Sequence, residues 1–194
     1  LEHLKTRQSL LGPFLVVAPL ATLEHWKREF ENWTDLNVVL YHASEGGRET
    51  REMIQKYEWH YPSGTKDQRR LVKFNVLLTS YELISSDFDD LFQIDWRCIV
   101  VDEAHRLKNL DSQLALSLNE YHFDHVVLMT GTPLQNDMLE LWALLHFIEP
   151  EIFSDAQSFI NEFGEMKDAN ALAALHDRLR PYMLRRLKED VEKS

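Results

Sequence analysis

The chain has 194 residues, which is enough for one sizeable hydrophobic core and too few for two large domains. With 44% hydrophobic and 27% charged residues, it contains no apolar run long enough to span a membrane, so we expect no membrane partner. The formal net charge of −11 argues against extensive contacts with nucleic-acid phosphates, although a local basic edge on an acidic domain still permits them. The single cysteine, Cys98, excludes an internal disulfide and suits a reducing compartment.

Short apolar runs along the chain predict buried strands. They lie at residues 14–18, 38–41, 76–79, 98–101 and 125–129. Other segments have helical periodicity or helix-start signals, with Thr22 and either Asp111 or Ser112 as candidate N-caps. These segments are residues 1–11, 22–33, 44–57 with its opening turn, 111–121 and 138–148. The polar stretches at residues 58–70 and 85–93 are predicted to be loops or connections.

The order of these elements indicates the fold class. Strands that alternate with helices predict a parallel sheet with helices on both faces, joined by right-handed crossovers, which is an α/β fold. Beyond Pro150 the strand signals stop, and apolar residues such as Phe159 and Leu172 recur at helical spacing. We therefore expect an α/β domain at residues 1–150 and a helical appendage at residues 151–194.

The most informative stretch is the apolar run at residues 98–101 and the four residues after it, Asp102-Glu103-Ala104-His105. A buried parallel strand delivers the residues after it to the carboxyl edge of the sheet, where open α/β sheets bind their ligands. Two adjacent carboxylates at such an edge suit nucleoside triphosphate hydrolysis, in which one holds magnesium and the other positions the attacking water. The alternative is a solvated Asp-Glu pair that opens a turn.

A second strand exit is also marked, because the run at residues 125–129 continues into Thr130-Gly131-Thr132. If the two strands are neighbours, His105 lies within hydrogen-bond reach of this loop and ties the acidic residues to it, a route for coupling hydrolysis to movement. Spacing alone does not show that the strands are adjacent. A simpler role of residues 130–136, compatible with the first, is a helix-starting turn with Pro133 at the first helical position.

Together, residues 101–109 (VDEAHRLKN) and 129–136 (MTGTPLQN) resemble motifs II and III of the SWI/SNF-like chromatin-remodelling ATPases of helicase superfamily 2. The wider match is most similar to the chromodomain-helicase-DNA-binding family and covers nearly the whole chain. It includes residues 12–20, 26–30, 96–98, 147–150 and 183–193.

The resemblance implies the first RecA-like lobe of a two-lobed motor in the nucleus that uses ATP and magnesium and moves along nucleosomal DNA. By motif position, Asp102 would serve magnesium, directly or through a metal-bound water, and Glu103 would orient the attacking water. His105 would act beside them and, with Thr130, Gly131, Thr132 and Gln135, would couple the two lobes. Other residues match positions at which the family's first lobe meets DNA. These are Thr22, Trp26, Thr79, Ser80, Tyr81, Lys108 and Asn109. For Trp26 the alternative is a core aromatic residue, which is the more common role of tryptophan.

The sequence departs from the family pattern in one respect. A phosphate-cradling loop needs G-x-x-x-x-G-K-[ST], and no glycine in this chain precedes a lysine. In the family that loop precedes the first helix, and the arginine fingers belong to a second lobe. We therefore expect this chain to be a fragment whose partners include the second lobe and accessory domains of a longer protein, and we expect it to hydrolyse essentially no ATP alone.

Two other functions remain open at the level of sequence. One is a related superfamily 2 motor that acts on nucleic acid outside chromatin, and the other is a motor-derived scaffold that binds but does not hydrolyse ATP. Residues 132–136 (TPLQN) argue against the first, since unwinding helicases resemble Ser-Ala-Thr there, and the intact acid pair weakens the second. The basic residues within 178–188 suit either a solvated helix or a contact between lobes.

Overall fold

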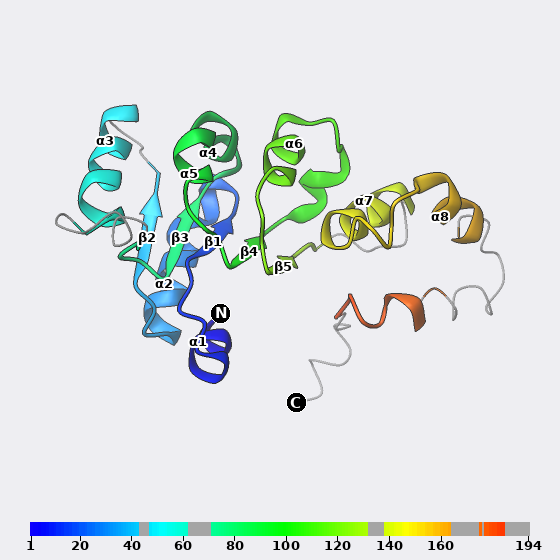
Figure 1. The fold of residues 1–194 in the computed structure, drawn as a ribbon, viewed down its shortest axis with the longest axis horizontal. Helices are drawn as coiled ribbons and strands as arrows, with labels where there is room; N and C mark the ends of the chain where they lie inside the picture. The colour runs from blue at the N-terminus through cyan, green and yellow to red at the C-terminus, as the bar shows by residue number, and fades with distance from the viewer. Residues whose placement is uncertain (43–46, 62–70, 132–137, 164–174, 176, 185–194) are drawn as a thin grey trace. The chain divides into compact units, whose positions relative to one another are not determined.

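A computed structural model describes residues 1–42, 47–61, 71–131, 138–163, 175 and 177–184. Its centre is a five-stranded parallel sheet with the strand order β2-β3-β1-β4-β5 (Figure 1). The strands are β1 (Phe14–Val17), β2 (Val38–Tyr41), β3 (Val76–Thr79), β4 (Cys98–Val101) and β5 (His125–Leu128). All five predicted strands are present, and the predicted α/β class is confirmed.

The central strands of the sheet are buried, whereas β5, an edge strand in the described part of the chain, is partly exposed. All four residues of β1, β3 and β4 are buried, which is why these strands are continuous apolar runs rather than alternating ones. Burial raises the pKa of the Cys98 thiol to about 11, as expected for a small buried apolar residue. The edge strand β5 differs, because its residues alternate between exposed and half-buried.

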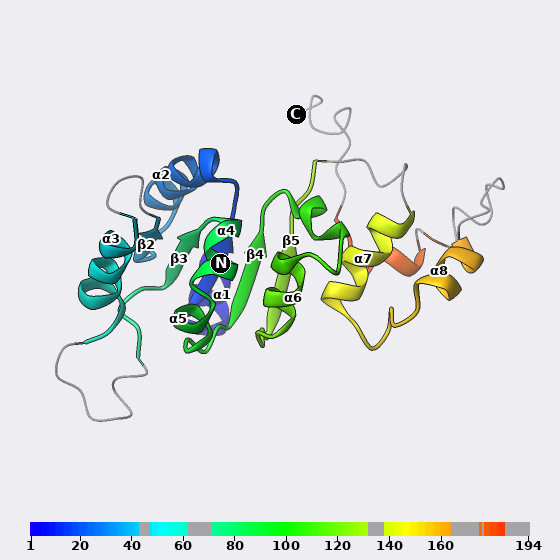
Figure 2. The same ribbon diagram turned by 90° about the horizontal axis from the view of Figure 1, so that it is seen from above.

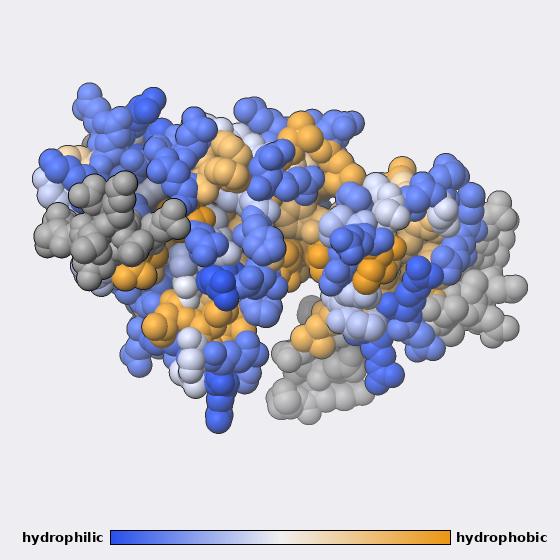
Figure 3. All heavy atoms as spheres, in the orientation of Figure 1, coloured by the Kyte–Doolittle hydropathy of each residue, from blue (hydrophilic) through white to orange (hydrophobic). Residues whose placement is uncertain are grey.

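Helices cover both faces of the sheet (Figures 1 and 2). Alternate strand residues such as Phe14, Val16 and Leu78 form one core cluster with Leu23 and Phe30 of α2 (Leu23–Trp33). Partly buried leucines at the amino terminus pack on the same cluster, and Figure 3 shows apolar surface over α1 (Glu2–Gln8). On the opposite side of the strands lie α4 (Tyr81–Ser86), α5 (Phe88–Phe92) and α6 (Gln113–Asn119).

Two local predictions were wrong. The polar connection predicted at residues 85–93 is mostly helical, because Ile84 and Leu91 are fully buried and anchor the short helices α4 and α5 on the sheet. Thr22 does not cap α2, since its hydroxyl donates to the Pro19 carbonyl at 2.9 Å within the turn η1 (Leu20–Thr22). Ser112 is the N-cap of α6 and accepts from the Ala115 amide at 3.2 Å.

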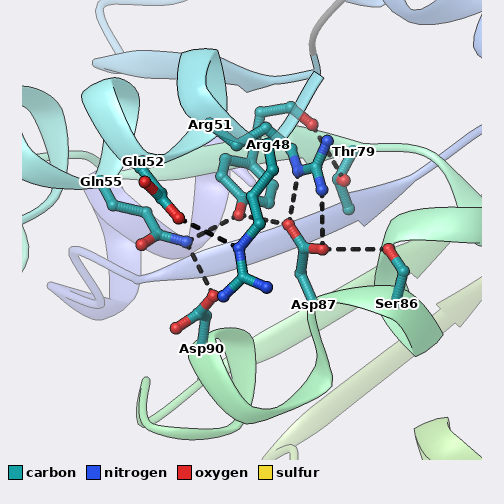
Figure 4. Close-up of polar contacts among 9 residues, drawn as sticks. Arg48, Arg51, Glu52, Gln55, Thr79, Ser86, Asp87 and Asp90 are labelled. Carbon is teal, nitrogen blue, oxygen red and sulfur yellow. Dashed lines mark hydrogen bonds and ion pairs between the residues drawn. The ribbon is translucent and has the colours of Figure 1, made fainter. Parts of the chain in front are cut away.

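A polar network fixes α3 (Gly47–Ile54) and the π-helical turn η2 (Gln55–Trp59) beside the sheet (Figure 4). Arg51 forms a bidentate ion pair with Asp87, with Nε–Oδ2 and Nη2–Oδ1 distances of 2.5 and 3.0 Å. The Tyr41 hydroxyl also donates to Asp87, at 2.6 Å, and Gln55 donates to both Tyr41 and Asp90. The network therefore links α3, the end of β2 and the start of α5.

The chain divides into two compact units, Leu1–Thr132 and Pro133–Ser194. In the second, α7 (Met138–Ile148) and α8 (Ala156–Phe163) share an apolar cluster that includes Leu141, Phe153 and Leu179. The division falls before α7, whereas the boundary predicted at residue 150 follows it, and the extent of the domain stays a prediction. None of the helices in the described parts of the chain is long and apolar enough to cross a membrane.

Candidate active site

The two marked strand exits lie side by side. Strands β4 and β5 pair in parallel register, with Val101 opposite Leu128, so the residues after each strand emerge at the same edge of the sheet. Backbone hydrogen bonds join the two exits, because the Met129 amide donates to Val101 and the Ala104 amide donates to Met129, both at 2.8 Å. Strands β4 and β5 are therefore neighbours, which the sequence alone did not show. Their pairing places the acidic turn beside the half-buried Thr130.

Four hydrogen bonds hold Asp102 in place. Its backbone amide donates to the Val17 carbonyl of β1 at 2.9 Å. One carboxylate oxygen, Oδ1, accepts from the Glu103 amide at 2.9 Å, and the other, Oδ2, accepts from the Trp26 indole Nε1 at 3.0 Å. The Tyr81 hydroxyl donates to its carbonyl oxygen. The Glu103 amide and the Trp26 indole fix the orientation of the half-buried carboxylate at the carboxyl edge of the sheet.

Glu103 has a left-handed backbone conformation, with φ 49° and ψ 46°, which is uncommon for a residue with a side chain. The turn it forms sends the chain into the 3₁₀ helix η4 (Ala104–Lys108) and leaves the Glu103 side chain 45% exposed. Strained backbone of this kind is concentrated at functional sites. The conformation is a feature of the candidate catalytic glutamate that the sequence did not predict.

His105 contacts Glu103 directly. Its Nδ1 lies 3.2 Å from Glu103 Oε2, which is within ion-pair distance when the ring is protonated. The predicted hydrogen bond from His105 to the loop at residues 130–132 stays a prediction. Of the proposed coupling residues, Thr130 and Gly131 are described and follow β5 directly, whereas Thr132 and Gln135 lie outside the described residues.

The predicted DNA-contact residues at the end of β3 and directly after it are buried. Thr79 is fully buried and its hydroxyl donates to the Tyr41 carbonyl at 3.1 Å. The exposed fractions of Ser80 and Tyr81 are 2% and 4%, and burial raises the pKa of the Tyr81 phenol. These side chains therefore have contacts inside the protein, and Tyr81 supports the acidic turn through the Asp102 carbonyl.

The other predicted DNA-contact residues differ in exposure. Thr22 and Trp26 are half-buried, and both use their polar atoms inside the protein. Lys108 and Asn109, at the end of η4, are exposed, with Asn109 Oδ1 accepting from the Asp111 amide at 3.1 Å. Lys108 and Asn109 are thus the members of the predicted set that present side chains to solvent.

Arg106 was not singled out by sequence reasoning, although it lies inside the acidic motif. Its guanidinium carbon lies 4.6 Å from the centre of the Tyr81 ring, and Nη1 lies 4.0 Å from Glu82. A hydrogen bond with Ser80 and the Arg106 charge lower the pKa of Glu82. The three side chains line an open pocket of about 600 Å³ together with Ser85, Ser112, Gln113 and Leu114. The feature of the sequence that could have identified Arg106 is its position directly after the DEAH residues 102–105.

The acid pair fits a magnesium ion held together with a nucleotide. Magnesium prefers oxygen ligands and retains several of its waters, so protein sites commonly supply one or two carboxylates. The Asp102 carboxylate has its orientation fixed by two N–H donors, yet each oxygen retains a further lone pair for a metal-bound water. The adjacent Glu103 carboxylate is exposed enough to meet a second water.

Comparison with known proteins assigns the family. The SNF2-related domain matches residues 1–194. Chromodomain-helicase-DNA-binding protein 8 of Homo sapiens is 48% identical over 188 residues, which are 94% of this chain and 7% of that protein. The human chromodomain-helicase-DNA-binding protein 7 is 49% identical over 94% of this chain and 6% of its own length. The chain therefore spans less than a tenth of the length of these relatives.

A solved structure agrees with this assignment. The SWI2/SNF2 ATPase core of Sulfolobus solfataricus in complex with dsDNA matches with a TM-score of 0.75 and 25% sequence identity. The match covers 97% of this chain and 36% of that one. It confirms the expected RecA-like fold, and the similarity to the chromodomain-helicase-DNA-binding proteins confirms the resemblance on which the predicted roles depend. The chain belongs to the SNF2-related domain family.

Proposed function

We propose that this chain forms the first ATPase lobe of an ATP-dependent chromatin remodeller in the nucleus, in which ATP hydrolysis drives translocation on nucleosomal DNA. The observation that carries the proposal is the acid pair Asp102-Glu103 at the end of β4, joined by backbone hydrogen bonds to the exit of β5. The similarity to chromodomain-helicase-DNA-binding proteins supports the chromatin role.

In this proposal the two carboxylates have different roles, Asp102 toward magnesium and Glu103 toward the attacking water. Asp102, held by Trp26 and by the Glu103 amide, would bind a magnesium-coordinated water beside the ATP phosphates. Magnesium supplies positive charge that stabilises the transferring phosphoryl group. Glu103 would orient the attacking water and accept its proton, and His105, 3.2 Å away, would restrain the Glu103 side chain.

The hydrogen-bonded residues after β4 and β5 would couple ATP hydrolysis to movement of the second lobe. The Ala104 amide bonds to Met129, so a shift of the acidic turn is transmitted directly to the backbone before Thr130 and Gly131. We propose that these residues, with Thr132 and Gln135, change position when ATP is hydrolysed and so alter the contact with a second lobe. The phosphate-binding loop, that lobe and the accessory domains would belong to a longer protein, and the 194-residue chain alone would hydrolyse essentially no ATP.

DNA binding is supported by the dsDNA in the related SWI2/SNF2 core. The net charge of −11 requires that the contacts be local ones, and the exposed Lys108 and Asn109 suit phosphate oxygens. Thr22 would contribute from η1, and we propose that the buried residues 79–81 act as a scaffold beneath this surface. Histone-wrapped DNA would be the substrate of the longer protein.

The test is Glu103→Gln in the full-length protein, because glutamine retains the shape of the side chain but cannot accept a proton. We expect DNA-stimulated ATP hydrolysis to fall by about 10²-fold or more, while binding of a fluorescent ATP analogue is retained. Glu120→Gln is the matched control, since Glu120 is an exposed glutamate after α6, and its turnover should equal that of the wild type. Wild-type turnover in Glu103→Gln would refute the assigned role.

A further inference from the structure

Trp26 reaches the acidic turn from a distant part of the chain. It lies in the second turn of α2, and its indole Nε1 donates to Asp102 Oδ2 across 76 residues of sequence at 3.0 Å. The ring is half-buried and its centre lies 5.9 Å from that of Phe30, which belongs to the core cluster on which Trp26 packs. The donor is therefore held by the hydrophobic core rather than by a loop.

The chemistry of this contact suits orientation of a carboxylate. An indole N–H is a donor only, so it binds the ionised carboxylate without offering a competing acceptor or changing its own protonation near neutral pH. Hydrogen bonds to charged groups are stronger than those between neutral groups, and a partly buried site strengthens them further. With Glu103 N–H on Oδ1 and Trp26 N–H on Oδ2, both oxygens of Asp102 have a fixed direction.

We propose that Trp26 is a positioning residue for the magnesium-serving carboxylate of Asp102, and that this role, rather than a DNA contact, is what its indole N–H performs. The inference rests on the proposed function, because it takes Asp102 to serve magnesium. Without the Trp26 N–H, Oδ2 loses this donor, and the Glu103 amide on Oδ1 alone restrains rotation of the carboxylate about χ2. The carboxylate then binds a metal-coordinated water less well.

The experiment compares two tryptophans of α2 in the full-length protein. Trp26→Phe retains an aromatic ring against Phe30 but removes the N–H. Trp33→Phe is the control, since Trp33 Nε1 also donates to a carboxylate at 3.0 Å, that of Glu29, but its side chain is 78% exposed at the end of the helix. The readouts are the free magnesium concentration that gives half-maximal DNA-stimulated ATP hydrolysis, kcat, and the affinity for a DNA duplex.

For Trp26→Phe we expect the half-saturating magnesium concentration to rise about tenfold, the size of one lost hydrogen bond to a charged group, with a smaller change in kcat. Affinity for DNA should stay within about twofold of wild type, and Trp33→Phe should match wild type in every readout. If Trp26→Phe weakens DNA binding and leaves the magnesium dependence unchanged, Trp26 is a DNA contact and the inference is overturned.

A second variant separates the hydrogen bond from general damage to the fold. Trp26→His retains a ring N–H at a similar distance from the backbone, so it should recover much of the loss seen in Trp26→Phe. Equal shifts in the two variants would overturn the inference, because the donor would then not be the cause. Normal magnesium dependence in Trp26→Phe, with turnover abolished in Glu103→Gln, would remove the positioning role alone. Normal turnover in Glu103→Gln would instead remove the proposed function.

Discussion

At the scale of single residues, the acidic turn combines an assignment visible in sequence with a conformation that is not. The order Asp102-Glu103 after an apolar run predicts carboxylates at a strand exit, and the structure has them there. The left-handed backbone of Glu103 has no signature in the sequence, since glycine is the residue that usually adopts positive φ. A glutamate in this conformation suggests that its side chain is retained for chemistry at a cost in stability.

This cost is measurable by substitution of Glu103. Glycine adopts φ near +49° without steric strain, whereas glutamine keeps the strain of the native residue. We expect Glu103→Gly to make local opening of the turn costlier than in Glu103→Gln by about 1 kcal/mol, while both variants are inactive. Hydrogen exchange of peptides covering residues 101–108 in the full-length protein reports this difference. Faster exchange in Glu103→Gly would show that the backbone at Glu103 is not strained.

At the scale of elements, α3 depends on polar contacts more than on a hydrophobic face, since none of its residues is buried. The Arg51 and Asp87 side chains are only 15% and 10% exposed, and their ion pair is reinforced by Tyr41 (Figure 4). Burial raises the pKa of Asp87, but the hydrogen bonds from Arg51, Tyr41 and Ser86 outweigh it, so the pKa lies below its ordinary value. This network therefore stabilises α3 while Asp87 is ionised.

We expect Asp87→Asn to destabilise α3 by about 3 kcal/mol, because it leaves the guanidinium of Arg51 buried without a counter-charge. Glu52→Gln is the control, since the Arg48–Glu52 pair of the same helix is exposed and should contribute less than about 1 kcal/mol. Hydrogen exchange of peptides covering residues 47–55 in the full-length protein measures both effects.

The pH dependence of this contribution is set by the lowered pKa of Asp87. It is fully present above the unfolded-state pKa of about 3.9 and is lost as the pH falls through the lower folded-state value. The difference in α3 protection between wild type and Asp87→Asn should therefore be constant from neutral pH to about pH 4 and should shrink below it. A difference that declines already near neutral pH would show that another group is responsible.

At the scale of the whole molecule, the local sequence pattern predicted the strands better than it predicted which strands and side chains lie next to one another. The apolar runs identified all five strands, because a buried parallel strand must be apolar on both faces. No spacing in the sequence shows that β1 lies between β3 and β4, or that Trp26 meets Asp102, since these contacts arise when distant segments pack. The burial of the side chains at residues 79–81 also arises from such packing and has no signature in the sequence, and their predicted contact with DNA stays a prediction.

In the part of the chain that the structure describes, β5 pairs with β4 alone and forms an edge of the sheet. Val127 is 44% exposed and Met129 is 42% exposed, although both fit the apolar pattern of a buried strand. The amides of His125 and Met129 donate to β4, so by alternation those of Val126 and Leu128 point away from it. An apolar edge whose outward amides meet no strand among the described residues is an aggregation hazard that proteins normally cover.

In the longer protein proposed above, we expect the segment that carries the phosphate-binding glycines to pair with β5. The amides of Val126 and Leu128, which point away from β4, should then exchange at least about tenfold more slowly in the full-length protein than in the 194-residue chain, because unpaired amides at a sheet edge exchange freely. Hydrogen exchange of peptides covering residues 125–129 measures this difference. Peptides from β4 are the control, since that strand is paired on both sides and should be protected in both proteins, which also verifies that the shorter one is folded. Equally fast exchange of β5 in both would show that this edge stays open, and the phosphate-binding segment would then have to reach Asp102 without adding a strand to the sheet.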